Sequence, residues 1–252
     1  MTTGSTPSHQ VWDAADPRAE AALRDASIGT LHDVWNSSNY VFIAELEHAE
    51  LGPGLGVYKP ERGERPLDDF PDGLYRREVA AYELARCLGW DIVPPTVERD
   101  AVHGPGSLQL FIEHDPRMHY FELRDRDDLD EQLVRFAVFD LLANNADRKG
   151  GHLLLDAGAH VWGIDNGLCF HAYPKLRTVV WDYAGTDIPD AWLDDVRRLC
   201  ASLAAGDAAS EALRALLDAG EVRALVTRCE QMLGSPVLPE MYPYRCVPWP
   251  LI

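Results

Sequence analysis

Four charged side chains have the types and the chain order that phosphate chemistry requires. Lys59 ends the apolar run GVYKP, and Glu78 stands in the helix-like run LYRREVAAYELARCLG. Asp147 lies in the turn-rich stretch NNADRKGGH, and Asp165 precedes Asn-Gly in VWGIDNGLCF. Phosphoryl transfer needs a cation on the phosphates, a carboxylate that holds this cation, a carboxylate that orients the acceptor hydroxyl, and a metal-binding aspartate. The order of these residues therefore favours a phosphotransferase site.

Taken singly, each residue has an ordinary structural explanation. Lys59 suits a solvated strand end, and Asp147 and Asp165 suit turns, because Asn, Asp and Gly favour turn backbone. On a helix, Glu78 shares its face with small and aromatic residues that would pack on a sheet, so it needs a cationic partner. Lys59 fits that need, and a surface pairing with Arg77 is the alternative.

The elements that must position these residues fall into two groups. In the first 115 residues, 17–28 predicts a short helix, and a longer helix at 74–89 ends at Gly89, a residue typical of helix C-termini. Alternating apolar patterns separated by glycine and proline predict strands. These strands lie at 40–46, at 56–60 and on both sides of the turn at 103–106.

The remainder of the chain is mainly helical. The run 129–146 is apolar nearly all round at its centre, which predicts a buried helix. A short hairpin between Asp147 and Asp165 follows it, and helical periodicity dominates 190–233. We therefore predict an α+β fold with a β-rich lobe at 1–115 and a helical lobe at 116–252. The crevice between such lobes is a common place for a ligand.

Two stretches, NNADRKGGHLLLD and GIDNGLCF, resemble the catalytic and metal loops of the phosphatidylinositol 3-/4-kinase superfamily. The resemblance is greatest to the type II phosphatidylinositol 4-kinases and more distant to HipA-type kinases. VYKP followed by REVAAYELA is similar to the lysine strand and glutamate helix of that group, and WNSSNYVF resembles its short Ser-rich phosphate loop. The resemblance implies a bilobal protein-kinase-like fold, with ATP and Mg²⁺ or Mn²⁺ as cofactors.

The resemblance also implies a role for each matched position. Lys59 would contact the ATP phosphates with Glu78 as its partner, and Asp147 would be the catalytic aspartate. Asp165 would bind the metal ion between the β- and γ-phosphates. The other nucleotide-binding positions would be Ser37, Ser38 and Asn39 at the phosphates, and Leu110, Phe111 and Ile112 as the hinge at the adenine.

One position departs from the family pattern. Five residues after the catalytic aspartate the family has a metal-binding asparagine, and this chain has His152. Mg²⁺ prefers hard oxygen ligands, whereas imidazole suits softer ions. His152 therefore binds Mn²⁺ or another transition ion, leaves one metal position empty, or is only structural. The sequence leaves these three alternatives open.

The amino-acid composition limits the kinds of partner that the protein can bind. The formal net charge is −18 and the isoelectric point is about 4.8. Such a surface repels nucleic acid phosphates and anionic lipid headgroups. The five cysteines are scattered and never spaced as CxxC, which favours a reducing compartment. The N-terminus has no signal-peptide pattern and no apolar run is long enough to span a membrane, so we expect a cytoplasmic protein.

The acceptor and the reaction stay open at this point. The resemblance implies a phosphoinositide lipid kinase, but the acidic surface favours a soluble acceptor, which is a hydroxyl of a small molecule or a protein. Transfer of AMP is a second reaction that the wider fold group allows. A pseudokinase that binds ATP as a scaffold is the non-enzyme alternative, and His152 in the asparagine position favours it. The oligomeric state is unknown.

Overall fold

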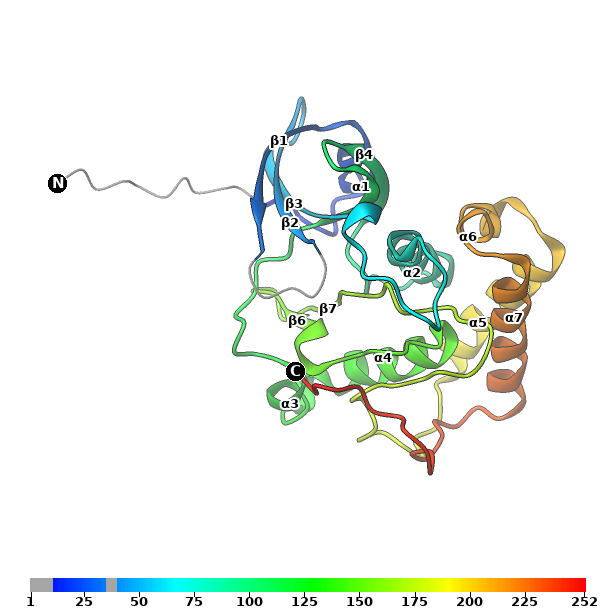
Figure 1. Cartoon of the computed structure of the whole chain (residues 1–252). Coiled ribbons are helices and arrows are strands. Elements are labelled where there is room, and N and C mark those ends of the chain that lie inside the picture. Colours follow the sequence, from blue (N-terminus) through cyan, green and yellow to red (C-terminus); the bar gives the residue numbers. More distant parts are fainter. Residues whose placement is uncertain (1–10, 35–39) are drawn as a thin grey trace.

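The structure is a computed structural model that describes residues 11–34 and 40–252. The large sheet, which has five strands, forms the upper part of the molecule in Figure 1, and most of the helices form the lower part. The strands are β1 (Ser27–Asp33), β2 (Phe42–His48), β3 (Gly52–Pro60), β4 (Thr96–Ala101), β5 (Gly104–Leu110), β6 (Leu153–Leu155) and β7 (Val161–Gly163). The α-helices are α1 (Ala19–Asp25), α2 (Leu74–Leu88), α3 (Tyr120–Leu123), α4 (Asp130–Ala143), α5 (Asp190–Ala205), α6 (Glu211–Leu216) and α7 (Ala219–Gly234).

The large sheet is antiparallel with the strand order β1-β2-β3-β5-β4. Side chains alternate between its two faces. In β3 this alternation buries Tyr58 in the core that the sheet shares with α1, and it turns Lys59 to the other face. Lys59 lies opposite Ser107 of β5, so the lysine stands on a central strand rather than at a free edge.

Strand β1 is an element that the sequence pattern did not predict, as is the short helix α3. The predicted helix at 17–28 ends at Asp25, and the chain continues as a strand from Ser27. No residue of β1 is fully buried, so the segment SIGTLHD has no apolar face that would mark it as a strand. Its pairing with β2 holds it in the sheet.

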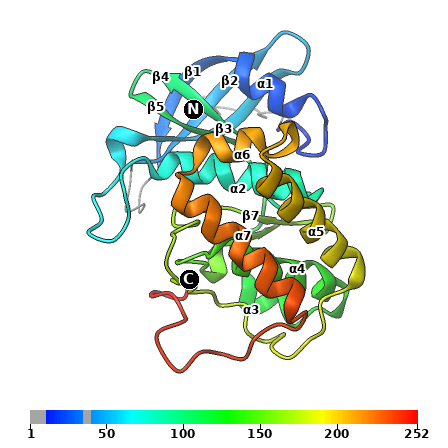
Figure 2. The same ribbon diagram turned by 90° about the vertical axis from the view of Figure 1, so that its right-hand side faces the viewer.

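Helix α2 lies between the sheet and the lower helices (Figures 1 and 2). It ends as predicted at Gly89, whose φ of 74° is the left-handed conformation that glycine adopts without strain. Its buried alanines, together with Leu84 and Leu88, belong to the large core of the helical part, not to the smaller core of the sheet and α1. The helix that carries Glu78 is therefore packed on the helical part, whereas Lys59 belongs to the sheet. The lobe boundary at 115/116 stays a prediction.

The buried helix and the hairpin occur where the pattern predicted them. Helix α4 is mostly buried, and β6 and β7 form a two-stranded antiparallel sheet after it. The tail from Ser235 onward has no helix or strand and follows the surface of the helical part (Figure 1). Within the described ranges, no helix is both long enough and apolar enough to cross a membrane.

Candidate active site

The predicted lysine, its glutamate and the second aspartate meet in one ion-paired group. Lys59 Nζ lies 2.5 Å from Glu78 Oε1 and 2.9 Å from Asp165 Oδ1. The Glu78 side chain is only 5% exposed, so its charge depends on this partner. The other oxygen of Glu78 accepts the backbone N–H of Asn166 at 2.8 Å. Strand β3, helix α2 and the Asp-Asn-Gly loop thus converge on Lys59.

The electrostatics of this group keep Lys59 and Asp165 charged. Desolvation lowers the pKa of Lys59, but attraction to Asp165 and Glu78 outweighs it and raises the pKa above its ordinary value. Attraction to Lys59 holds the pKa of Asp165 far below the ordinary range of an aspartate. A full positive charge beside a full negative charge is the arrangement that binds phosphate oxygens on one side and a metal cation on the other.

Asp147 lines the same cleft but has a different environment. It is half-buried, and desolvation raises the pKa of its carboxyl. Lys149 Nζ lies 2.8 Å from Asp147 Oδ2 and opposes that rise. The backbone N–H of Asp147 donates to the side chain of Asn145 at 3.0 Å, which fixes the start of the loop. A carboxyl with a raised pKa accepts a proton more readily than an ordinary aspartate.

His152 lies against the same aspartate as Lys59. Its Nε2 is 3.2 Å from Asp165 Oδ2, and burial lowers the pKa of its imidazole to about 4. A neutral imidazole nitrogen and a neighbouring carboxylate oxygen can both coordinate the same cation. In 11–34 and 40–252, no three side chains of His, Cys, Asp or Glu are grouped to hold a metal. A cation bound by His152 and Asp165 would therefore need further oxygen ligands, which nucleotide phosphates supply.

The sequence pattern did not assign a role to Arg148 or Asn166, yet these residues hold the two loops together. The guanidinium of Arg148 is fully buried and donates to both oxygens of Asp140, a residue of α4, at 3.0–3.2 Å. It also donates to the carbonyl of Ile164 at 2.9 Å and to the side chain of Asn166 at 2.8 Å. The signal that could have found Arg148 is its place directly after Asp147.

Backbone conformation supports both loops. Asn144, which ends α4, has φ 52°, and Asp165 has φ 56°. Asn and Asp tolerate this left-handed region better than other side chains. The side chain of Asn144 donates to two carbonyls, those of His171 and Tyr173, at 2.8 Å each. The turn chemistry noted in the sequence is therefore present, and it places Asp165 at the cleft.

The other predicted nucleotide-binding positions are not brought to the cleft among the residues that the structure describes. Ser37, Ser38 and Asn39 lie outside the described residues. Leu110 and Ile112 are buried, and the N–H of Phe111 donates to the carbonyl of Leu55. None of these three hinge positions lines the cavity around Lys59. The roles of all six residues stay predictions.

The cleft around the ion-paired group has a volume of about 390 Å³, within the usual range of ligand sites. Lys59, Glu78, Asp147 and Asp165 all line it. Trp249, from the C-terminal tail, lines it as well and is 78% exposed. Two residues later, the carbonyl of Leu251 accepts the N–H of Gly150 at 2.7 Å, so the tail is attached to the loop that holds Asp147. Nothing in the sequence indicated this contact.

Comparisons with known proteins match the chain to a family profile and to a mycobacterial protein. The profile of the family described as phosphatidylinositol 3- and 4-kinase matches residues 86–191. Protein Rv2133c of Mycobacterium tuberculosis is 39% identical over 264 aligned residues, which cover 91% of this chain and 94% of that protein.

Two solved structures align along most of the chain. The structure of hydra Fam20 with sugar aligns over 85% of this chain and 86% of that chain, with a TM-score of 0.52 and 15% identity. That of the Helicobacter pylori proinflammatory kinase CtkA covers 86% of this chain and 94% of that chain, with a TM-score of 0.48 and 12% identity.

Proposed function

The chain belongs to the phosphatidylinositol 3- and 4-kinase family and has the bilobal protein-kinase-like fold, and on this premise we propose that it is an ATP-dependent kinase. The γ-phosphate would pass to a hydroxyl of a soluble small molecule or protein, in the reducing cytoplasm. All five cysteines are free thiols, which is compatible with such a compartment. The observation that carries the proposal is the ion-paired group of Lys59, Glu78 and Asp165 in one cleft with Asp147.

In this proposal each member of the group has one task. Lys59 binds phosphate oxygens, and Glu78 holds the lysine in place through the 2.5 Å contact. Asp165 and His152 hold the divalent cation, which neutralises the charge of the transferred phosphoryl group. Lys59 and His152 both contact Asp165 in this structure, so nucleotide and metal must replace part of these contacts.

Asp147 would orient the acceptor hydroxyl and accept its proton. Burial raises its pKa, and a general base works best when its pKa approaches the pH at which the enzyme acts. Lys149, paired with the same carboxylate, would stabilise negative charge that develops on the transferred group. Arg148 positions the loop rather than contacting the reactants, because its guanidinium is fully buried.

A soluble acceptor is supported by charge. With a net charge of −18, the molecule is repelled by anionic lipid surfaces. A lipid acceptor is the second candidate, because large apolar side chains of the tail are exposed beside the cleft. These are Trp249, which lines the cleft, and its neighbours Leu251 and Ile252, which lie against the loop of Gly150 and Gly151. Incubation with γ-labelled ATP and vesicles of phosphatidylcholine and phosphatidylinositol separates the candidates, since label in the lipid fraction would favour the second.

Thermal unfolding with ATP and either Mg²⁺ or Mn²⁺ tests the nucleotide site itself. A ligand at 100 times its dissociation constant stabilises the folded state by about 2.7 kcal/mol. For a chain of this size the midpoint rises by about 5–10 °C. We expect this rise in the wild type and its loss in Asp165→Ala. The matched control is Asp194→Ala, which removes an exposed carboxylate of α5 and should keep the full rise.

The two metals test the role of His152. If the imidazole is a ligand, Mn²⁺ gives a larger rise than Mg²⁺, and His152→Asn reverses the preference. No rise with any nucleotide and metal would contradict the proposal. A rise without any turnover would instead favour an ATP-binding module that does not transfer phosphate.

A further inference from the structure

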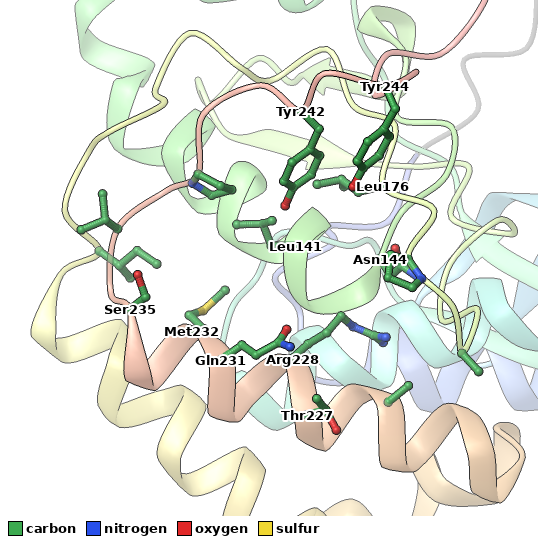
Figure 3. A pocket seen from close by; sticks show the side chains of 16 residues that line it. Leu141, Asn144, Leu176, Thr227, Arg228, Gln231, Met232, Ser235, Tyr242 and Tyr244 are labelled. Atoms are coloured by element: carbon green, nitrogen blue, oxygen red, sulfur yellow. The ribbon is translucent and has the colours of Figure 1, made fainter.

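A second and larger cavity lies in the helical part, away from Lys59 and the other charged residues of the cleft. Its volume is about 530 Å³, and it is bordered by α4, α7 and the C-terminal tail (Figure 3). Cavities of this size hold small organic molecules. None of the residues proposed for phosphoryl transfer lines it. The function proposed for the cleft therefore does not account for this cavity.

The walls of the cavity differ in charge from the rest of the protein. Of the 252 residues, 41 are Asp or Glu. Among the 16 residues that line the cavity, all in the described part of the chain, there is no acidic residue and one cationic residue, Arg228. Although the molecule has a net charge of −18, an anion bound in this cavity would not be repelled by a carboxylate of the cavity wall.

Arg228 is held in place but not satisfied. Its Nε donates to the carbonyl of Leu142 at the end of α4, at 2.6 Å. Its Nη2 is buried and has no hydrogen-bond partner among the described residues, and none of their ion pairs includes Arg228. Desolvation lowers the pKa of this guanidinium to about 10, because the cost of burial outweighs the attraction to Cys229, Cys169 and Glu221. Capping of the C-terminal end of α4 by Arg228 explains the contact of Nε with Leu142, but it does not explain why Nη2 is left without a partner in the part of the chain that the structure describes.

The opposite wall is aromatic. In Figure 3, Tyr242 and Tyr244 extend from the tail toward Arg228 and Gln231 on α7. The two tyrosine rings are stacked, with centroids 5.1 Å apart and planes inclined by 7°. Leu141, Leu176 and Met232 add apolar surface around them. An apolar body can therefore lie against the tyrosines while a charged group reaches the guanidinium.

We propose that this cavity binds a small organic anion, in which a carboxylate or phosphate group is attached to an apolar body. The anionic group pairs with the guanidinium of Arg228, the one cationic side chain among the described residues that line the cavity. The apolar body packs between the tyrosines of the tail and the leucine and methionine side chains of α4 and α7. The site is separate from the cleft, so this inference does not depend on the function proposed there.

A pair of fluorescent probes tests the proposal on the full chain. 1-Anilinonaphthalene-8-sulfonate carries an anion on an aromatic body, and N-phenyl-1-naphthylamine has the same body without the sulfonate. We expect saturable binding of the sulfonate probe to the folded wild type. Arg228→Gln should weaken this binding at least about ten-fold, the order expected for loss of a charge-assisted pair, and should leave binding of the neutral probe nearly unchanged.

Two further variants complete the test. Arg223→Gln removes an exposed arginine of the same helix and should bind both probes like the wild type. Ala224→Phe places a ring in the cavity and should abolish binding of both probes, which keeps the test valid if Arg228→Gln does not fold. Unchanged sulfonate binding in Arg228→Gln, or unchanged binding of both probes in Ala224→Phe, would overturn the proposal.

Discussion

At the scale of single residues, the cleft places two aspartates in opposite environments. Attraction to Lys59 keeps the pKa of Asp165 far below its ordinary range, whereas burial raises the pKa of Asp147. Two carboxyls whose pKa values are shifted in opposite directions can take different roles. One can serve as a permanently charged metal ligand and the other as a proton acceptor. The two roles therefore predict different results when Asp147 or Asp165 is replaced.

Replacing Asp147 with Asn tests the proton-accepting role. The amide keeps the shape of the side chain but cannot accept the proton, so we expect the rate of ADP formation to fall by about 10²- to 10⁴-fold. The free energy of unfolding should change by less than about 1 kcal/mol, because the ion pair that Asp147 forms among the described residues is the partly exposed one with Lys149. Asp194→Asn is the control. An unchanged rate in Asp147→Asn would remove Asp147 from the mechanism.

The buried imidazole of His152 predicts a particular dependence of stability on pH. Its pKa is about 4 in the folded protein and near 6.5 when unfolded. Between these values the unfolded chain binds a proton that the folded chain does not, so stability is full above pH 6.5 and is lost as the pH falls toward 4.

The measurement is urea unfolding without divalent cations at pH 7.5 and pH 5.5, above the isoelectric point of about 4.8. The wild type should lose about 1–1.5 kcal/mol more than His152→Asn over this range, since one pKa unit corresponds to 1.36 kcal/mol. Parallel losses in the two proteins would mean that the imidazole is not buried in its neutral form.

At the scale of elements, the two loops that carry Asp147 and Asp165 depend on one arginine. Arg148 joins Asp140 of α4 to Ile164 and Asn166 of the Asp-Asn-Gly loop. Thr178 donates to the same Asp140 at 2.9 Å, so the network also reaches the segment after the loop. Removing one partner of a buried ion pair leaves the other charge without compensation.

We therefore expect Arg148→Met to lower the free energy of unfolding by about 3–5 kcal/mol. Adding Asp140→Asn should recover part of this loss, because no unpaired charge then remains in the core. Arg148→Lys should also be destabilised, since an ammonium group cannot reproduce the forked contacts of a guanidinium. Urea unfolding measures all three, with Arg126→Met as an exposed control. A loss below about 1 kcal/mol in Arg148→Met would contradict the role of the network.

The elements also show what the sequence could predict. Helices α2 and α4 and the β6–β7 hairpin have strong periodicity or turn signals, and all three occur as predicted. Strand β1 has no buried face, so its place depends on pairing with β2, which no local pattern records.

Some site residues could likewise be predicted from local sequence, and others could not. Lys59, Glu78 and Asp165 stand in recognisable local motifs, and the structure brings them together. The contacts of Arg148 with Asn166 and of Gly150 with Leu251 join distant segments, so they follow only from the fold.

At the scale of the whole molecule, the C-terminal tail connects the cavity of α7 with the cleft. Tyr242 and Tyr244 line the cavity, and Trp249 lines the cleft. Between them the carbonyl of Cys246 accepts hydrogen bonds from the backbone N–H of Thr178 at 3.0 Å and from the indole of Trp181 at 3.1 Å. The tail is therefore fixed at its middle, and its last six residues can be removed without disturbing this anchor.

Ending the chain after Cys246 tests whether the tail supports the loop that carries Asp147. The N–H of Gly150 would lose the carbonyl of Leu251, a hydrogen bond that typically contributes about 0.5–1.5 kcal/mol. Amide exchange in the peptide around Gly150 should then be about 2- to 13-fold faster, the factor that this free energy corresponds to. Trp249→Ala is the matched control, because it removes the indole but keeps the backbone of Leu251.

The comparison separates two ways in which the tail can act. Faster exchange at Gly150 in the truncated chain alone, together with a smaller thermal rise with ATP and Mn²⁺, would mean that the tail positions the loop of Asp147 and His152. A smaller thermal rise in Trp249→Ala with unchanged exchange would mean that the indole acts as a wall of the cleft. Unchanged exchange in the truncated chain would show that the tail separates from the loop in solution, and the contact of Leu251 would then have no part in positioning Asp147 and His152.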